Sequence, residues 1–210
     1  MAKFTRGFDM DVAAAHLARR DRKLGRWIDR IGPLPQEGWS KSFDTVDALA
    51  RSILYQQLSG KAAATIVGRV ETATGSRKLT RAALSSIDDV QLRACGVSGN
   101  KALALRDLVA RAETGEVPTQ GELSSLHHDE IIERLTAVRG IGRWTVEMLL
   151  MFRLGRPDIF PVTDLGVRKG FGLVFVRGKL PDPATMQRRG ERWRPYRSVA
   201  SWYLWRALEL

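Results

Sequence analysis

Cysteine is almost absent from the sequence, because Cys95 is the only one in 210 residues. A single thiol excludes a disulfide within the chain, a zinc ribbon and an iron–sulfur cluster held by four cysteines. Long apolar runs are missing too: no segment approaches the roughly 20 apolar residues of a membrane span. Residues 1–11 carry charges where a signal peptide would have its apolar stretch. We therefore expect a cytoplasmic protein with no membrane partner.

Acidic residues are in the minority, 23 against 34 basic ones, which leaves a net charge of +11. A basic surplus favours contact with a polyanion, although a basic protein with no special partner explains the charge equally well. We expect the basic residues between 19 and 30 to form the solvated face of a helix, as runs of charge usually do. Residues 188–197 mix arginines with Trp193 and Tyr196. That mixture fits nucleic-acid contact better, unless the two aromatic side chains belong to the core.

A convincing pair of β-strands is also lacking. The apolar run 171–176 has glycines around it, which favour a loop or a short helix, and no second strand is present to pair with it. Elsewhere apolar residues recur at helical spacing, as in residues 46–54, and we predict helix N-caps at Asp44, Ser59 and Asn100. We predict an all-α fold of two helical subdomains with a cleft between them. One subdomain comprises residues 1–40 plus 156–210, and the other comprises residues 41–155.

The most informative segment is the glycine-containing turn of residues 138–145, which lies between two helical patterns. Its two glycines permit a positive φ and the close approach of another backbone, and its isoleucine would anchor the turn in the core. The following helix N-terminus favours a phosphate, through free N–H groups and the helix dipole. An ordinary helix connection is the alternative, because Gly-x-Gly alone is a weak signal. The candidate DNA contacts are Gly140, Ile141, Gly142, Arg143 and Thr145.

The sequence resembles the helix-hairpin-helix DNA glycosylase superfamily at this point. Residues 138–145 are similar to its hairpin, and residues 161–164 (Pro-Val-Thr-Asp) fall where it has a Gly/Pro-rich loop and a catalytic aspartate. Residues 56–59 (Gln-Gln-Leu-Ser) and 193–198 (Trp-Arg-Pro-Tyr-Arg-Ser) narrow the resemblance to the alkylated-base branch, 3-methyladenine DNA glycosylase II. It covers about residues 40 to 208. The chain looks like a compact form without the β-rich domain with which larger members begin.

The resemblance implies that Asp164 is the catalytic carboxylate, facing the sugar of a flipped-out nucleotide. Breaking an N-glycosidic bond builds positive charge on the deoxyribose, which a nearby carboxylate stabilises while it orients or deprotonates water. A base alkylated at a ring nitrogen is already cationic and leaves without a strong general acid. The structural alternative is that Asp164 is a helix N-cap, and the two roles are compatible.

Three aromatic residues are candidates for the base pocket. Strand-nicking relatives have a lysine at the position of Trp144, where it forms a Schiff base; tryptophan cannot do so, which implies a monofunctional enzyme without lyase activity. An electron-rich ring at Trp144 would instead attract a cationic base. Trp205 matches a second wall of the pocket, and Tyr55 completes it. Core packing is the alternative for Trp205 and for Tyr55.

Base flipping leaves a hole in the duplex that a wedge residue normally fills. The resemblance places the wedge in the loop formed by Val97, Ser98, Gly99 and Asn100. A count along this loop puts glycine at the wedge position, where it cannot fill a hole, so a neighbour such as Val97 or Asn100 would have to substitute. Hairpins of this family also hold a structural monovalent cation, here through the backbone of Thr136, Val138 and Ile141. No other cofactor is implied.

The resemblance therefore implies a monomeric DNA glycosylase acting on double-stranded DNA that contains alkylated bases, associated with the nucleoid if the protein is bacterial. The expected reaction is hydrolysis of the N-glycosidic bond of the 3-methyladenine and 7-methylguanine class, which leaves an abasic site for base excision repair. One alternative is a glycosylase for deaminated or oxidised bases. The other is a non-catalytic helix-hairpin-helix module, which needs the hairpin but neither Asp164 nor aromatic pocket walls.

Overall fold

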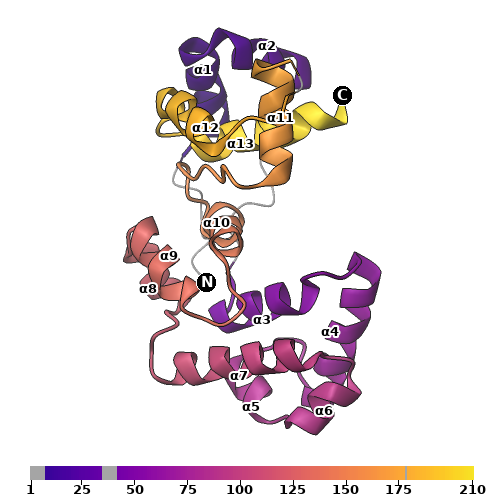
Figure 1. The fold of residues 1–210 in the computed structure, drawn as a ribbon. Coiled ribbons are helices and arrows are strands. Elements are labelled where there is room, and N and C mark those ends of the chain that lie inside the picture. Colours follow the sequence, from indigo (N-terminus) through magenta and orange to yellow (C-terminus); the bar gives the residue numbers. More distant parts are fainter. Residues whose placement is uncertain (1–7, 35–41, 178) are drawn as a thin grey trace. The chain divides into compact units, whose positions relative to one another are not determined.

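The structure is a computed structural model that describes residues 8–34, 42–177 and 179–210. Over these residues it is helical and has no strand, which confirms the predicted all-α class (Figure 1). None of the described helices is long and apolar enough to cross a membrane. The chain divides into two compact units. We call residues 42–146 the central unit, and residues 1–41 with 147–210 the terminal unit.

The division agrees with the predicted boundary near residue 40 and differs at the second one. The predicted boundary between the subdomains follows residue 155. In the structure, the boundary between the units falls between Val146 and Glu147, inside α10 (Arg143–Phe152). The sequence gives no signal there, because the apolar pattern of the helix continues on both sides of the division.

The central unit is a set of capped helices. They are α3 (Thr45–Tyr55), α4 (Gly60–Thr74), α5 (Arg81–Ser85), α6 (Asp89–Ala94), α7 (Gly99–Glu113), α8 (Gln120–Ser125) and α9 (His128–Thr136). Asp44 and Ser59 cap α3 and α4 as predicted, each accepting a backbone N–H of the first turn. The predicted cap at Asn100 is wrong. Ser98 caps α7 instead, through the Lys101 N–H, so the helix begins one residue before Asn100.

The terminal unit packs around α13 (Arg197–Arg206), most of whose residues are buried. Its other helices are α1 (Met10–Arg20), α2 (Arg22–Ile31), α11 (Leu165–Phe175), α12 (Pro183–Gly190), and the short 3-10 segments η1 (Glu191–Trp193) and η2 (Ala207–Glu209). Helices α1, α2 and α11 all contact α13. Trp193 is fully buried in this core, so the core alternative holds for its side chain.

The apolar run 171–176 is helical through Phe175, as the second half of α11. Glycine serves a packing role in this helix. A Cβ at Gly170 would lie 1.9 Å from the Leu204 carbonyl oxygen, so only glycine lets α11 and α13 approach so closely. The glycines that favour a loop in the sequence are therefore, in part, the condition for a tight helix–helix contact.

Candidate active site and DNA-contact surface

In the hairpin of the central unit, Gly140 has the positive φ that its sequence permits, and Gly142 does not. Gly140 has φ of +79°, and the side chain of Ile141 is buried at 4% exposure, which confirms it as the anchor of the turn. The Ile141 N–H donates to the Val138 carbonyl at 3.0 Å, and the Thr145 N–H donates to the Gly142 carbonyl at 3.0 Å. A Cβ at Gly142 would meet no atom within 4 Å, so this glycine faces open space.

Two polar side chains fix neighbouring loops to this hairpin. Gln56 Nε2 donates to the Gly140 carbonyl at 2.8 Å. Lys101 Nζ donates to the carbonyl oxygens of Leu54 at 2.7 Å and of Gln56 at 2.8 Å, and burial lowers the pKa of this amine. A cavity of about 370 Å³ lies between these loops, with Gln57, Asn100 and Arg139 among its lining residues. The loops after α3 and before α7 thus share one surface with the hairpin.

The residues predicted to contact DNA in the hairpin differ in how exposed their side chains are. Arg143 is exposed at the start of α10, whereas the side chain of Thr145 is buried at 8% exposure. Little of Thr145 is therefore left for a phosphate. Trp144 and Tyr55, two predicted pocket residues of the central unit, are 47% and 44% exposed. Tyr55 is thus not the core residue that the alternative required.

Most residues of the predicted wedge loop lack an available side chain that could fill the hole left by a flipped base. Val97 is 2% exposed, the exposed Ser98 is engaged as the cap of α7 and Gly99 has no side chain, so Asn100 is the one candidate left in this loop. The sequence reasoning missed Gln57, which is exposed and has φ of +56°. A non-glycine residue in this conformation is uncommon and marks strain held by its surroundings. In the sequence it stood out only as part of the Gln-Gln-Leu-Ser segment of residues 56–59, at the break between two helical patterns.

The predicted cation site stays a prediction. Within the described residues, no group of three or more His, Cys, Asp or Glu could hold a metal ion, so any ligands would be backbone oxygens. The Val138 carbonyl accepts the Ile141 N–H, and a carbonyl oxygen has a second lone pair available. A structural monovalent cation held by the carbonyls of Thr136, Val138 and Ile141 is compatible with that bond and remains a prediction.

Asp164, in the terminal unit, is both a helix cap and a fixed carboxylate. It is the N-cap of α11, and its Oδ1 accepts the Val167 N–H at 2.7 Å. The same oxygen accepts the indole N–H of Trp205 at 2.8 Å. The capping role is therefore confirmed, and it does not conflict with the predicted chemical one. Two donors from different helices fix the orientation of this carboxylate.

The structure brings Trp205 to Asp164, but as a hydrogen-bond donor at the end of α13. Its ring stacks on Phe152 of α10, with centroids 5.9 Å apart and an interplanar angle of 30°. Gly166 makes room for the indole: a Cβ there would lie 2.7 Å from Cδ1 and 2.8 Å from Nε1 of Trp205, and 3.1 Å from Oδ1 of Asp164. Trp205 is half-buried, so it is not simply the core residue of the alternative.

Residues 50–195 match the family model described as the HhH-GPD superfamily base excision DNA repair protein. The chain belongs to this superfamily. Among its relatives, DNA-3-methyladenine glycosylase 1 of Schizosaccharomyces pombe is 34% identical over 199 residues, which cover 94% of this chain and 87% of the relative. The resemblance seen in the sequence is thereby confirmed.

Solved structures of the HhH-GPD superfamily agree with this fold. The Schizosaccharomyces pombe 3-methyladenine DNA glycosylase in complex with abasic DNA has a TM-score of 0.81 at 34% identity, covering 95% of this chain and 97% of that one. The crystal structure of a DNA-3-methyladenine glycosidase from Bacillus halodurans has a TM-score of 0.86 at 33% identity, covering 99% and 92%.

Proposed function

We propose that the protein is a DNA glycosylase that hydrolyses the N-glycosidic bond of alkylated bases in double-stranded DNA and leaves an abasic site. The observation that carries the proposal is the Asp164 carboxylate, fixed by Val167 and Trp205 at the start of α11 in a member of the HhH-GPD superfamily. Relatives named DNA-3-methyladenine glycosylases support bases of the 3-methyladenine and 7-methylguanine class as the substrates.

Cleavage of the N-glycosidic bond of an alkylated base requires little more from the protein than a negative charge in a fixed position. As the glycosidic bond breaks, the deoxyribose becomes oxocarbenium-like, and the Asp164 carboxylate stabilises that charge and orients the attacking water. Because two donors already set the carboxylate's direction, it needs no reorganisation in the transition state. The alkylated base is cationic at the start and departs as a neutral molecule, so no general acid is required.

The same residues argue for a monofunctional enzyme. Trp144 stands where strand-nicking relatives have the lysine that attacks the sugar, and an indole is not a nucleophile of that kind. Its exposed ring, and that of Tyr55, suit stacking on a cationic base. Incubation with damaged DNA and borohydride is expected to trap no covalent adduct. A trapped protein–DNA adduct would refute the monofunctional proposal.

The hairpin supplies the grip on the DNA backbone, through the N–H groups at the start of α10 and the open face of Gly142. Gln57 replaces the 97–100 loop as the proposed wedge, because its exposed side chain is held out by a strained backbone on the hairpin's own surface. Gln57→Ala should slow base release from paired DNA more than release from a lesion opposite a gap. An equal effect on both substrates would contradict this role.

Base release from methylated DNA tests the function directly. Wild type should release 3-methyladenine and 7-methylguanine, whereas Asp164→Asn should release neither at a measurable rate while binding abasic DNA within about threefold of wild type. Asparagine keeps the capping oxygen, so the fold is preserved. Release of deaminated or oxidised bases alone, from a panel of single-lesion duplexes, would establish the other enzymatic alternative. A chain that binds DNA and releases no base from any lesion would be a non-catalytic module.

A further inference from the structure

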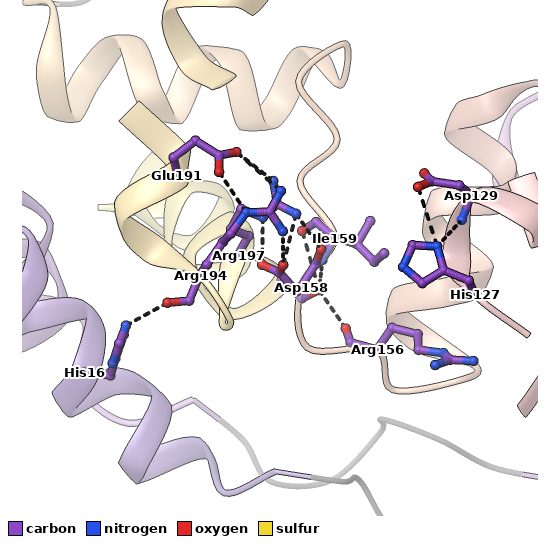
Figure 2. Close-up of polar contacts among 10 residues, drawn as sticks. His16, His127, Asp129, Arg156, Asp158, Ile159, Glu191, Arg194 and Arg197 are labelled. Atoms are coloured by element: carbon purple, nitrogen blue, oxygen red, sulfur yellow. Dashed lines mark hydrogen bonds and ion pairs between the residues drawn. The ribbon is translucent and has the colours of Figure 1, made fainter. Parts of the chain in front are cut away.

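The loop that leads to Asp164 is attached to the first turn of α13 by a buried ion pair. Arg197 is 7% exposed, and its Nε lies 2.6 Å from Oδ1 of Asp158. Its Nη2 donates to Oδ2 of Asp158 at 3.0 Å and to the Asp158 carbonyl at 3.1 Å. Figure 2 shows this two-pronged contact, in which one guanidinium holds both the carboxylate and the backbone of the loop.

Neighbouring side chains complete the network. Arg194 Nη1 donates to Oδ2 of Asp158 at 2.6 Å, and its Nε donates to Glu191 at 2.8 Å (Figure 2). The hydrogen bond from Arg194 holds the pKa of Glu191 below its usual range. His16 Nε2 of α1 lies 2.9 Å from the Arg194 carbonyl oxygen. Asp158 is therefore neutralised by two arginines, of which Arg197 is the buried one.

Ser198 adds a second attachment at the same turn. Its hydroxyl donates to the Arg156 carbonyl at 2.6 Å and accepts the Ile159 N–H at 2.9 Å. Its own N–H donates to the Pro157 carbonyl at 2.9 Å. These bonds satisfy the polar backbone of an irregular segment whose Ile159 is buried, and unpaired groups there would be costly. Residues 156–159 are therefore fixed to α13 by backbone as well as by side chain.

The other end of α13 reaches the end of the same loop. Trp205 lies eight residues after Arg197, about 12 Å along a helix, and donates to Asp164. Between the two attachments, Phe160 packs edge-on against Trp193, with ring centroids 5.3 Å apart. One rigid helix thus holds the first residues of the loop and the carboxylate that ends it.

We propose that Arg197 is a positioning residue for Asp164, acting through Asp158 so that the loop begins at a fixed place relative to Trp205. This inference rests on the proposed function, because its kinetic readout is base release. Stability alone is a poor reason for the pair, since a buried ion pair is often no more stabilising than apolar residues of similar size. Apolar side chains, however, could not hold the Asp158 carboxylate and carbonyl together.

The terminal unit contains a matched control. Arg189 donates to both carboxylate oxygens of Asp21 at 2.8 Å, and this aspartate is buried too. That pair joins α12 to the cap of α2 and hydrogen-bonds no residue of the 156–164 loop; its link to the loop is Trp193, which donates to Asp21 and packs against Phe160. Replacing either arginine by methionine removes a two-pronged ion pair from the same unit. Both variants should be less stable than wild type, but only Arg197→Met should disturb Asp164.

The experiment compares wild type, Arg197→Met, Arg197→Lys and Arg189→Met in single-turnover base release with excess enzyme. The affinity for abasic DNA is measured alongside. We expect Arg197→Met to lower the single-turnover rate roughly 10- to 100-fold, the loss typical of a misplacement of about 1 Å, with abasic-DNA affinity unchanged within about threefold. Arg197→Lys should recover part of the rate because it keeps one contact to Asp158. Arg189→Met should stay within about twofold of wild type.

A second readout does not depend on activity. The indole N–H signal of Trp205 in ¹⁵N-labelled protein is assigned with Trp205→Phe, and its exchange with water is followed. The signal should shift and exchange faster in Arg197→Met but not in Arg189→Met. The proposal requires both the kinetic and the spectroscopic change, and either one missing in Arg197→Met overturns it. If wild type releases no base, the proposed function is refuted, but the positioning role of Arg197 can still be tested. The Trp205 signal then decides whether Arg197 positions the Asp164 end of the loop.

Discussion

At the scale of single residues, Gly166 leaves no room for a side chain, because a Cβ there would lie 2.7 Å from Cδ1 of Trp205. Gly166→Ala should slow base release at least 10-fold, because the added Cβ must displace either Trp205 or Asp164. Gly68→Ala in α4 is the control: a Cβ there meets nothing within 4 Å, so it should stabilise the helix by about 0.5–1 kcal/mol and leave the rate alone. Single-turnover rates and urea unfolding measure the two effects. A Gly166→Ala enzyme as fast as wild type would show that the indole contact is dispensable.

The Asp21 carboxyl should make the free energy of unfolding depend on pH. Burial acts to raise the pKa of this carboxyl, but the hydrogen bonds and charge of Arg189, with smaller contributions from Trp193 and the Leu24 N–H, lower it overall. A carboxyl with a lower pKa in the folded state stabilises the fold above its unfolded pKa, near 3.8. The stabilisation is lost as the pH falls through the folded value. The free energy of unfolding of wild type should therefore exceed that of Asp21→Asn at pH 7, and the difference should shrink below about pH 4. A difference independent of pH would contradict the assignment.

At the scale of elements, the two hairpin glycines have separate tasks. Gly140 has positive φ, and a Cβ there would lie 3.4 Å from Ala104, so Gly140→Ala should destabilise the central unit. Gly142 faces open space, so Gly142→Ala should fold normally, while its methyl group obstructs the approach of a phosphate backbone. Gly142→Asp should weaken binding further through its charge. Thermal unfolding and affinity for undamaged duplex DNA distinguish the tasks. Equal losses of stability in both alanine variants would refute this division.

Elements with local causes could be predicted from the sequence, and contacts distant along the chain could not. The caps at Asp44 and Ser59 and the hairpin follow from residues within one turn of each other. The Arg197–Asp158 pair joins residues 39 apart, and neither residue type nor spacing distinguishes it from an ordinary surface charge. Trp205 was predicted as part of the site, yet its bond to Asp164 depends on how α11 crosses α13. Gln57 could not be singled out beforehand, because exposure and backbone strain are not visible in the sequence.

Over the whole molecule, charge is distributed unevenly between the units. The terminal unit carries 21 of the 34 Lys and Arg and 11 of the 23 Asp and Glu, so nearly all of the net charge of +11 belongs to it. The central unit, which contains the hairpin, has 13 basic and 12 acidic residues. The proposed contact of the hairpin with DNA therefore relies on backbone groups of a nearly neutral unit, and the terminal unit carries the charge available for long-range attraction of DNA.

The arginines of α2 are the clearest candidates for that attraction. Arg22, Arg26 and Arg30 recur at four-residue spacing, are exposed, and form no ion pair with another described residue. Like charges at this spacing cost helix stability. Replacing all three by glutamine should reduce the slope of log affinity against log salt by about 0.9 for each phosphate that the variant no longer neutralises. The control replaces Arg81, Arg106 and Arg111, which are all ion-paired, and should change the slope less. Equal slopes in the two triple variants would show that only total charge matters.

The two attachments made by α13 also limit how the chain can change length. An inserted residue advances a helix by about 1.5 Å and turns everything beyond it by about 100°, so one extra residue between Ser198 and Trp205 would rotate the indole away from Asp164. In the described part of the connection between α11 and α12, Leu180 is 51% exposed. Insertions and deletions should therefore be tolerated near Leu180 and eliminated by selection within α13. The eight-residue spacing between Arg197 and Trp205 should accordingly stay constant during evolution, even where the side chains around it change.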